Sequence, residues 1–320
     1  MKRFAMCVCL ILMSAAAWGQ GFPSRPLKIL VPFPPGGGTD VAARALAEHL
    51  GREFAQAVVV DNRPGGNSVI ATEALARSAP DGHTLLLTTD FHSINAAFGA
   101  RLPYDSLKDF AFVAQVSTSP LMLVAHPSAG AKTLSELAGA AKRDPGKLSF
   151  ASLGTSSPHY LGFEWWKRMA ALDILDVPYK GGGPALADLL GGQVKLMFIV
   201  AANGIRQARA GKLTALAVSG PRRASVAPEV PTFAESGYPE FVLLNWYGVL
   251  VPAGTPREAI IKLNAAIVAA LNTAAVIERL AGVGVDAAPG TPEQLDDWVR
   301  KDIERYRKII ELTGAKPEGR

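Results

Sequence analysis

The feature that most constrains the fold is an alternation of short apolar runs with helical patterns, which occurs in two series along the chain. The first series has apolar runs at 27–33, 57–62 and 83–89, separated by stretches of helical periodicity. Continuous apolar strands separated by helices are typical of a parallel sheet with both faces covered. The runs of the second series lie at 121–127, 148–152, 174–179, 195–200 and 213–220. The pattern therefore predicts an α/β fold with two lobes in one chain.

The last part of the sequence predicts one more strand, at 244–253, and then only helices. Two of these helices are expected to begin at the Thr-Pro pairs 255–256 and 291–292, with proline in the first helical position. Glu258 and Gln294 stand three residues after the two threonines, which is the spacing of a capping box.

Residues 1–20 have the organisation of a secretory signal peptide. A basic start, MKR, precedes an apolar run, and Ala15–Ala17 supplies a small-residue cleavage site. The apolar run is shorter than the roughly 20 residues that a membrane-spanning helix needs. Cys7 and Cys9 would be removed with this leader, so the mature chain would have no disulfide and no thiol nucleophile. We expect a secreted chain that is stabilised by its hydrophobic core, which fits a bacterial periplasm.

The charge of the chain is mildly basic. The formal net charge is +5, from 33 basic and 28 acidic residues, and removal of Lys2 and Arg3 with the leader leaves 31 against 28, or +3. The basic residues are scattered and form no block of like charges. This distribution gives no support for a nucleic-acid partner, whereas a small anionic solute remains compatible with it.

The stretch VPFPPGGGTDVAARALAEHL, residues 31–50, has the order strand end, glycine loop and helix start. It is not a P-loop, because no lysine follows Gly38, and Val41 replaces the third glycine of a dinucleotide fingerprint. Glycines let a ligand approach backbone N–H groups, and a helix N-terminus favours negative charge. Two interpretations stay open: an anion-binding loop, or a tight turn whose glycines serve packing. We expect Thr39 or Asp40 to cap the helix, and Asp40 would repel an anion unless it turns inward to the backbone.

Catalytic and metal-binding motifs are not found in the sequence. No G-x-S-x-G elbow is present, and the histidines form no H-E-x-x-H motif or close pair. We therefore expect no catalytic residue, no metal and no cofactor. A second glycine-rich turn, YKGGGPA at 179–185, favours another backbone cradle that faces the first across a cleft. His159 either faces this cleft or simply lies in the first turn of its helix.

Six motifs, taken together and in their order along the chain, resemble one family of receptors. They are RPLKILVPFPPGGGTDVAARALAEHL, VVVDNRPGG, LPYDSLKDFAFVAQV, VPYKGGGPALADLLGGQVKLMF, AGKLTALAVSG and WYGVLVPAGTP. Each motif is weak alone, but six in register closely resemble the Bug (TctC-like) family, the periplasmic solute receptors of tripartite tricarboxylate transporters. The resemblance extends from Phe22 to the last predicted helix.

The resemblance implies a type II periplasmic-binding-protein fold, in which two α/β lobes close like a flytrap on a small carboxylated solute. We expect a signal peptide at 1–20, a first lobe at 21–123 plus 237–320, and a second lobe at 124–236. The receptor is expected to be a monomer that delivers its solute to the membrane subunits of the transporter or, alternatively, docks on a sensor kinase. A secreted hydrolase is the remaining alternative, and it requires a nucleophile–base pair in the cleft.

The resemblance also implies which residues bind the solute. The loop after the first strand and the loop that carries Tyr-Lys-Gly would grip one carboxylate, partly through water, and two further segments would complete the pocket. The implied binding residues are Phe33, Pro34, Gly36, Gly37, Gly38, Thr39, Asp40, Thr88, Thr89, Asp90, Ser152, Thr155, Ser156, His159, Tyr179, Lys180 and Gly181.

The sequence departs from the family pattern at three places. TTDFHSIN replaces a Ser-rich stretch, so Asp90 puts a negative charge at the expected pocket, which would repel a second carboxylate or pair with an amine. His159 stands one residue early in the segment GTSSPHY. Ile199 and Val200 occupy positions where the family often has a polar residue, and Asn203 is the next polar group and the expected ligand contact there.

Overall fold

The computed structural model of the protein describes residues 21–99 and 101–317, so the predicted signal peptide at 1–20 lies outside the described residues. The described strands are β1 (Leu27–Val31), β2 (Val58–Asn62), β3 (Thr84–Thr89), β4 (Phe110–Ala125), β5 (Ser149–Ser152), β6 (Leu175–Pro178), β7 (Leu196–Val200), β8 (Thr214–Val218), β9 (Leu244–Pro252) and β10 (Ala287–Gly290). The described helices are α2 (Gly38–Phe54), α3 (Val69–Ala76), α4 (Phe91–Ala97), α5 (Leu134–Arg143), α6 (Pro158–Ala170), α7 (Gly182–Leu190), α8 (Ala201–Arg209), α9 (Arg257–Leu271), α10 (Ala274–Gly282) and α11 (Pro292–Thr313).

One sheet runs through the molecule in the strand order β2-β1-β3-β9-β4-β7-β5-β6, and β10 and β8 pair with β4 outside this path. β1 is parallel to β2 and β3, and β5 is parallel to β6 and β7. β4 and β9 run antiparallel to each other, and each is antiparallel to its other neighbours. The predicted α/β architecture is confirmed, but the sheet is mixed rather than parallel because β4 and β9 pass through it.

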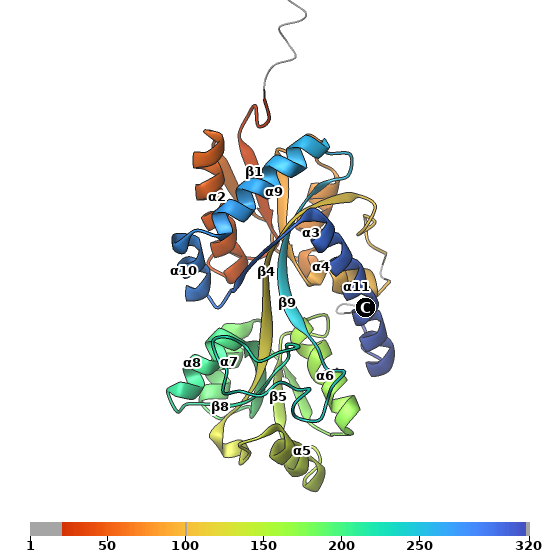
Figure 1. The fold of residues 1–320 in the computed structure, drawn as a ribbon. Coiled ribbons are helices and arrows are strands. Elements are labelled where there is room, and N and C mark those ends of the chain that lie inside the picture. Colours follow the sequence, from red (N-terminus) through yellow and green to blue (C-terminus); the bar gives the residue numbers. More distant parts are fainter. Residues whose placement is uncertain (1–20, 100, 318–320) are drawn as a thin grey trace, which may run out of the picture.

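Two lobes are joined where β4 and β9 cross between them (Figure 1). The upper lobe contains β1–β3, β10, α2–α4 and α9–α11, and the lower lobe contains α5–α8 and β5–β8. β4 and β9 pair from Phe110↔Pro252 to Pro120↔Leu244, and β4 then continues into the lower lobe, where it pairs with β7 and β8. The residue boundaries expected for the two lobes stay a prediction.

Three elements differ from the expectations of the sequence. β4 begins at Phe110 rather than near 121, because its first half pairs with β9. The chain after 253 is not wholly helical, because β10 pairs with β4. After the strand predicted at 83–89, a further helix, α4, begins at Phe91, and the sequence pattern did not predict it.

Of the two C-terminal capping boxes predicted from the sequence, one is present. Thr291 and Gln294 form a complete capping box at the start of α11, as expected. Thr255 forms none with Glu258, because its hydroxyl donates instead to the carbonyl oxygen of Pro252 at 2.7 Å. Helix α9 therefore begins without a side-chain cap.

Apolar side chains on both faces of the sheet form the core of each lobe. The lower lobe has an aromatic centre, in which the rings of Phe150 and Phe163 stack with centroids 3.6 Å apart and Trp166 contacts Phe233 edge-on. In the upper lobe, α2 and α9 pack on one face of the sheet, and α3 and α11 cover the other, where Trp246 is fully buried. These cores hold the loops at the strand ends in fixed positions.

Candidate functional site

The loops that carry the predicted site residues face each other across the crossing of β4 and β9. β3 ends at Thr89, opposite Tyr247, and β7 ends at Val200, opposite Leu121. Both ends lie near Pro120, where β4 passes from one lobe to the other. Because β1 is parallel to β3, and β5 and β6 are parallel to β7, the carboxyl ends of all these strands point toward the crossing. The two lobes therefore present to each other the strand ends at which α/β proteins bind ligands.

The loop between β1 and α2 leaves backbone donors free. Helix α2 begins at Gly38, and Gly37 before it provides no side-chain cap. The N–H groups of Gly38, Thr39 and Asp40 have no acceptor in the described part of the protein. Unpaired N–H groups at a helix N-terminus carry partial positive charge and bind anions. Of the two interpretations that the sequence left open, the free donors favour an anion-binding loop.

The carboxylate of Asp40 is used inside the same loop. It accepts hydrogen bonds from Arg44 Nε at 2.9 Å, from the N–H of Gly36 at 3.0 Å and from Asn62 Nδ2 at 3.0 Å. Burial acts to raise the pKa of Asp40, but these hydrogen bonds outweigh it, so the pKa lies below its ordinary value. The predicted N-cap is wrong, because Gly37 occupies that position. Asp40 turns inward to the N–H of Gly36, which is the condition under which it would not repel an anion, and Arg44 pairs its negative charge.

A cavity of about 360 Å³ lies beside this loop. Small-molecule sites have volumes of roughly 300–1,000 Å³, so this one suits a small solute. Six of the residues that line it belong to the site predicted from the sequence: Phe33, Pro34, Gly37, Gly38, Thr39 and Thr89. Four more lining residues were missed: Pro35, Phe91, Asn245 and Tyr247.

Asn245 and Tyr247 line the cavity from β9, because alternate residues of a strand point to the same side. Trp246 between them points to the opposite side, where its indole N–H donates to Asp302 at 2.8 Å. The side-chain oxygen of Asn245 is buried and has no hydrogen-bond partner among the described residues. An asparagine inside an apolar strand, followed two residues later by a tyrosine, was the available sequence signal for this wall.

Gly38 marks the closest approach of the loop to β9. A Cβ atom at this position would lie 2.8 Å from Tyr247 Oη and 3.2 Å from Val285 Cγ2. Tyr247 also hydrogen-bonds the side chain of Thr39, and burial raises the pKa of Tyr247 to about 12. Glycine is thus required here by packing, in addition to the access it gives to the backbone.

Two of the predicted site residues, Thr88 and Asp90, lie behind the cavity wall. Both are buried, and neither lines the cavity. Oδ2 of Asp90 has no hydrogen-bond partner in the part of the chain that the structure describes. Burial, with a further contribution from nearby Asp302, raises the pKa of Asp90 well above its ordinary value. The group that the sequence placed at the pocket as a negative charge is therefore a buried acid whose ionised form is disfavoured.

The predicted residues of the lower lobe lie at the N-terminal ends of three helices and do not line this cavity. Helix α7 begins after Gly181 without a side-chain cap, as α2 does after its glycine. The positions are Ser152 at the end of β5, Thr155, Ser156 and His159 at the start of α6, Tyr179, Lys180 and Gly181 before α7, and Asn203 in the first turn of α8.

Side chains of this lower group differ in what they can offer a ligand. Tyr179 donates its hydroxyl to Asp188 Oδ2 at 2.7 Å, so it is held against α7. Burial lowers the pKa of His159 to about 4, which keeps its imidazole neutral. Asn203 lies close to the upper lobe, because a Cβ atom built on Gly284 would lie 3.1 Å from its Nδ2 atom.

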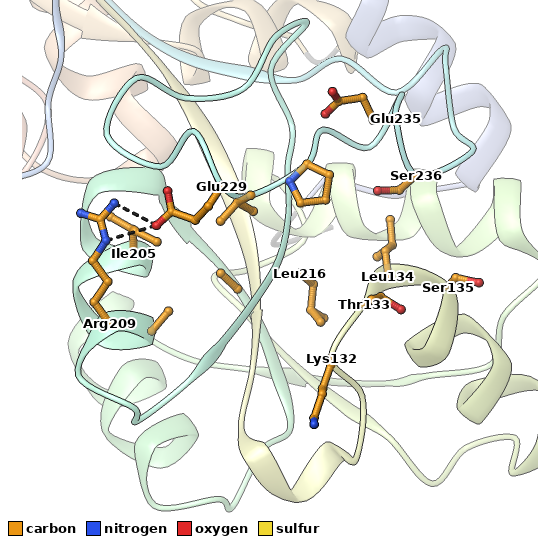
Figure 2. A pocket seen from close by; sticks show the side chains of 14 residues that line it. Lys132, Thr133, Leu134, Ser135, Ile205, Arg209, Leu216, Glu229, Glu235 and Ser236 are labelled. Carbon is orange, nitrogen blue, oxygen red and sulfur yellow. Dashed lines mark hydrogen bonds and ion pairs between the residues drawn. The ribbon is translucent and has the colours of Figure 1, made fainter.

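A second cavity, of about 610 Å³, lies in the lower lobe between α5, α8 and residues 229–236 (Figure 2). None of the predicted site residues lines it. Arg209 and Glu229 in its wall form an ion pair at 2.9 Å, as the dashed lines in Figure 2 show. Because these charges are already paired and the cavity is away from the facing strand ends, the cavity at the crossing is the better candidate for a ligand site.

Neither a metal-ligand cluster nor a single membrane-spanning helix is found among the described residues. No group of three or more His, Cys, Asp or Glu side chains is placed to hold a metal ion there. No single helix among the described residues is long and apolar enough to span a membrane. The helices α9 and α10 together have the length and composition of a span, but the pair is bent by 74°.

The fold and the site together define a class of protein, a two-lobed receptor of the periplasmic-binding-protein type with a small cavity beside the N-terminus of α2 at the lobe crossing. The sequence profile described as "Tripartite tricarboxylate transporter family receptor", TctC, matches residues 42–315. The chain belongs to this family of solute-binding receptors.

Relatives of the chain agree with this assignment. Protein BugT of Bordetella pertussis (strain Tohama I) is 39% identical over 297 residues, which cover 92% of this chain and 91% of BugT. The solved structure "R. palustris Rpa4515 with adipate" has a TM-score of 0.82 at 31% identity and covers 92% of this chain and 99% of its own. MatC (Rpa3494) from Rhodopseudomonas palustris with bound malate has a TM-score of 0.77 at 33% identity, with coverages of 90% and 100%. The predicted family and two-lobed fold are confirmed.

Proposed function

We propose that the protein is a periplasmic receptor that binds a small carboxylated solute between its lobes, leaves it chemically intact, and delivers it to the membrane subunits of a tripartite tricarboxylate transporter. The observation that carries this proposal is the set of free N–H groups at Gly38, Thr39 and Asp40 beside a small cavity at the lobe crossing. The structures solved with adipate and malate support the chemical class, because both of these ligands are small carboxylates.

Closure of the lobes would complete the site. The carboxylate of the solute would accept hydrogen bonds from the loop 33–40, and the segments 152–159 and 179–181 with Asn203 would then close over it. The connection between the lobes supports such a motion. Within the described residues, the chain passes from one lobe to the other where β4 and β9 cross, near Pro120. Hinge closure around a ligand concentrates the change in a few residues of this kind.

Native mass spectrometry of the purified protein tests the identity of the solute. A small carboxylated compound should be carried through purification, released on denaturation, and recovered with an unchanged mass after incubation. Deletion of the gene should abolish cellular uptake of the same compound. Conversion of the compound to a product by the pure protein would instead establish the hydrolase alternative.

Thermal unfolding with a panel of carboxylates gives an independent test. A solute that binds only the folded chain stabilises it by RT ln(1 + [L]/Kd), about 2.7 kcal/mol at a hundredfold excess over Kd. For a chain of this size, this corresponds to a rise in melting temperature of roughly 5 °C. If no carboxylate raises the melting temperature and none is carried through purification, the proposed function is wrong.

A further inference from the structure

Two aromatic side chains stand apart from the hydrophobic core. Among the residues that the structure describes, Phe33 and Phe91 are the two aromatic residues that pack against none of the four core clusters. Both are only half-buried, and both line the cavity at the lobe crossing. Their rings are therefore not part of the hydrophobic core, and their position at the cavity makes them accessible to a ligand.

The two rings contact each other at the cavity. Their centroids are 5.7 Å apart with an interplanar angle of 65°, which is an edge-to-face pair. Phe33 comes from the loop after β1, and Phe91 is the first residue of α4, so two separate elements bring the rings together. Aromatic rings extend such arrangements readily, because the positive edge of one ring is attracted to the negative face of the next. A third ring, supplied by a ligand, would cover the apolar surface that the pair leaves open.

The cavity lacks the groups that a second carboxylate would need. None of its lining residues is a lysine, arginine or histidine. Arg44, on the neighbouring helix, is already engaged with Asp40. Lys180 belongs to the opposite lobe and does not line the cavity. A second negative charge placed between the rings would lose its hydration without gaining a partner.

We propose that the solute is an aromatic monocarboxylate, whose ring packs against Phe33 and Phe91 while its carboxylate meets the backbone N–H groups of Gly38 and Thr39. This inference rests on the proposed function as a carboxylate receptor and specifies its ligand class. The side-chain oxygen of Asn245, which has no partner among the described residues, is available to accept a hydrogen bond from a hydroxyl group on the ring. The ligand class therefore differs from the aliphatic dicarboxylates adipate and malate found in the related structures.

Calorimetry with four acids tests the ligand class. Benzoate and cyclohexanecarboxylate have the same number of carbons and the same charge, so their comparison isolates the aromatic character of the ring. Adipate and malate represent the dicarboxylates. We expect benzoate to bind about fivefold or more tightly than cyclohexanecarboxylate, the factor that one or two aromatic contacts supply. Both monocarboxylates should bind more tightly than either dicarboxylate.

Variants of the two rings show whether these side chains cause the preference. Phe91→Leu keeps an apolar side chain but removes the ring, so the ratio of benzoate to cyclohexanecarboxylate affinity should fall to about twofold or less, with cyclohexanecarboxylate little changed. Phe33→Leu is a second test of the same kind. Circular dichroism checks that each variant folds, and the variant that folds is used if the other does not. Phe54→Leu removes a half-buried ring at the far end of α2 and should leave the ratio unchanged.

The possible failures are distinguishable. If adipate or malate binds most tightly to the unmodified protein, the inference on the aromatic ligand is wrong, whereas the carboxylate receptor stands. If the preference for benzoate survives both ring variants, Phe33 and Phe91 do not determine it and the inference is also wrong. If none of the four acids binds, the inference fails, and mass spectrometry of the carried ligand decides whether the proposed function fails with it.

Discussion

Substitution of Asp302 should change how the stability of the protein depends on pH. Asp302 lies on α11 and is fully buried. Its Oδ2 atom accepts from Trp246 Nε1 at 2.8 Å, and its Oδ1 atom accepts from Arg305 Nη1 at 2.9 Å. Burial nevertheless raises its pKa to about 6, against the opposing effects of Arg305 and the hydrogen bonds. The folded protein therefore holds this proton more tightly than the unfolded chain does.

The sign and size of the effect follow from this shift in pKa. The stabilisation by the bound proton is fully present below the unfolded pKa of 3.8 and is lost as the pH rises to the folded value of about 6. Each pKa unit corresponds to about 1.36 kcal/mol, so the whole loss is about 3 kcal/mol. Between pH 4.5 and 7.5, the free energy of unfolding should decrease by about 2 kcal/mol through this group alone.

Asp302→Asn removes the proton but keeps an acceptor and nearly the same shape. Urea unfolding, followed by tryptophan fluorescence at pH 4.5 and 7.5, measures both proteins. The free energy of unfolding of the variant, relative to that of the unmodified protein, should rise by about 2 kcal/mol between pH 4.5 and 7.5. Any pH-independent loss of stability caused by the substitution cancels in this comparison. Asp297→Asn, an exposed acid on the same helix, controls for the loss of a carboxylate. Equal differences at the two pH values would refute a raised pKa for Asp302.

Three further predictions concern the site and the wall behind it. Gly37→Val should fold, because a Cβ atom there meets only Pro34 O at 3.9 Å and φ is −78°. The valine side chain should fill the cavity and abolish binding of the tightest acid, and unchanged affinity in calorimetry would remove the loop from the site. Gly38→Val should lower the free energy of unfolding, measured in urea, by about 1–3 kcal/mol, because its Cβ would lie 2.8 Å from Tyr247 Oη. A stability equal to that of the Gly37 variant would contradict this close approach. Asp90→Asn should gain stability relative to the unmodified protein as the pH rises, because burial raises the pKa of Asp90; a relative stability that falls with pH would contradict this.

The part of the candidate site that could be recognised from the sequence depends on local chemistry. Glycines at the start of a helix leave the N–H groups of Gly38 and Thr39 free, and this does not depend on contacts with distant segments. The loop could therefore be recognised from its own residues. The parallel strand ends could be recognised because continuous apolar runs separated by helices place the following loops on one edge. Both inferences needed only sequence neighbours.

The part that was missed depends on contacts between distant segments. The first half of β4 carries too many polar residues for an apolar run, and it is a strand because β9 pairs with it. Asn245 and Tyr247 face the cavity only because β9 lies beside β3 in this register. Asp90 looked like a pocket residue from its place after β3, but α11 covers it, and that helix is more than two hundred residues away in the sequence. Periodicity does not report which face a distant helix will cover.

The two buried acids behind β9 bear on the charge near the site. Asp302 has Arg305 and Trp246 as partners, and its pKa is about 6. Asp90 has an oxygen without a partner among the described residues, and burial together with nearby Asp302 raises its pKa well above the ordinary value. The carboxylate of Asp302 pairs with Arg305 rather than with a group at the cavity. The cavity on the near side is left with neutral walls, aromatic rings and free backbone donors, an environment that suits one carboxylate and disfavours two.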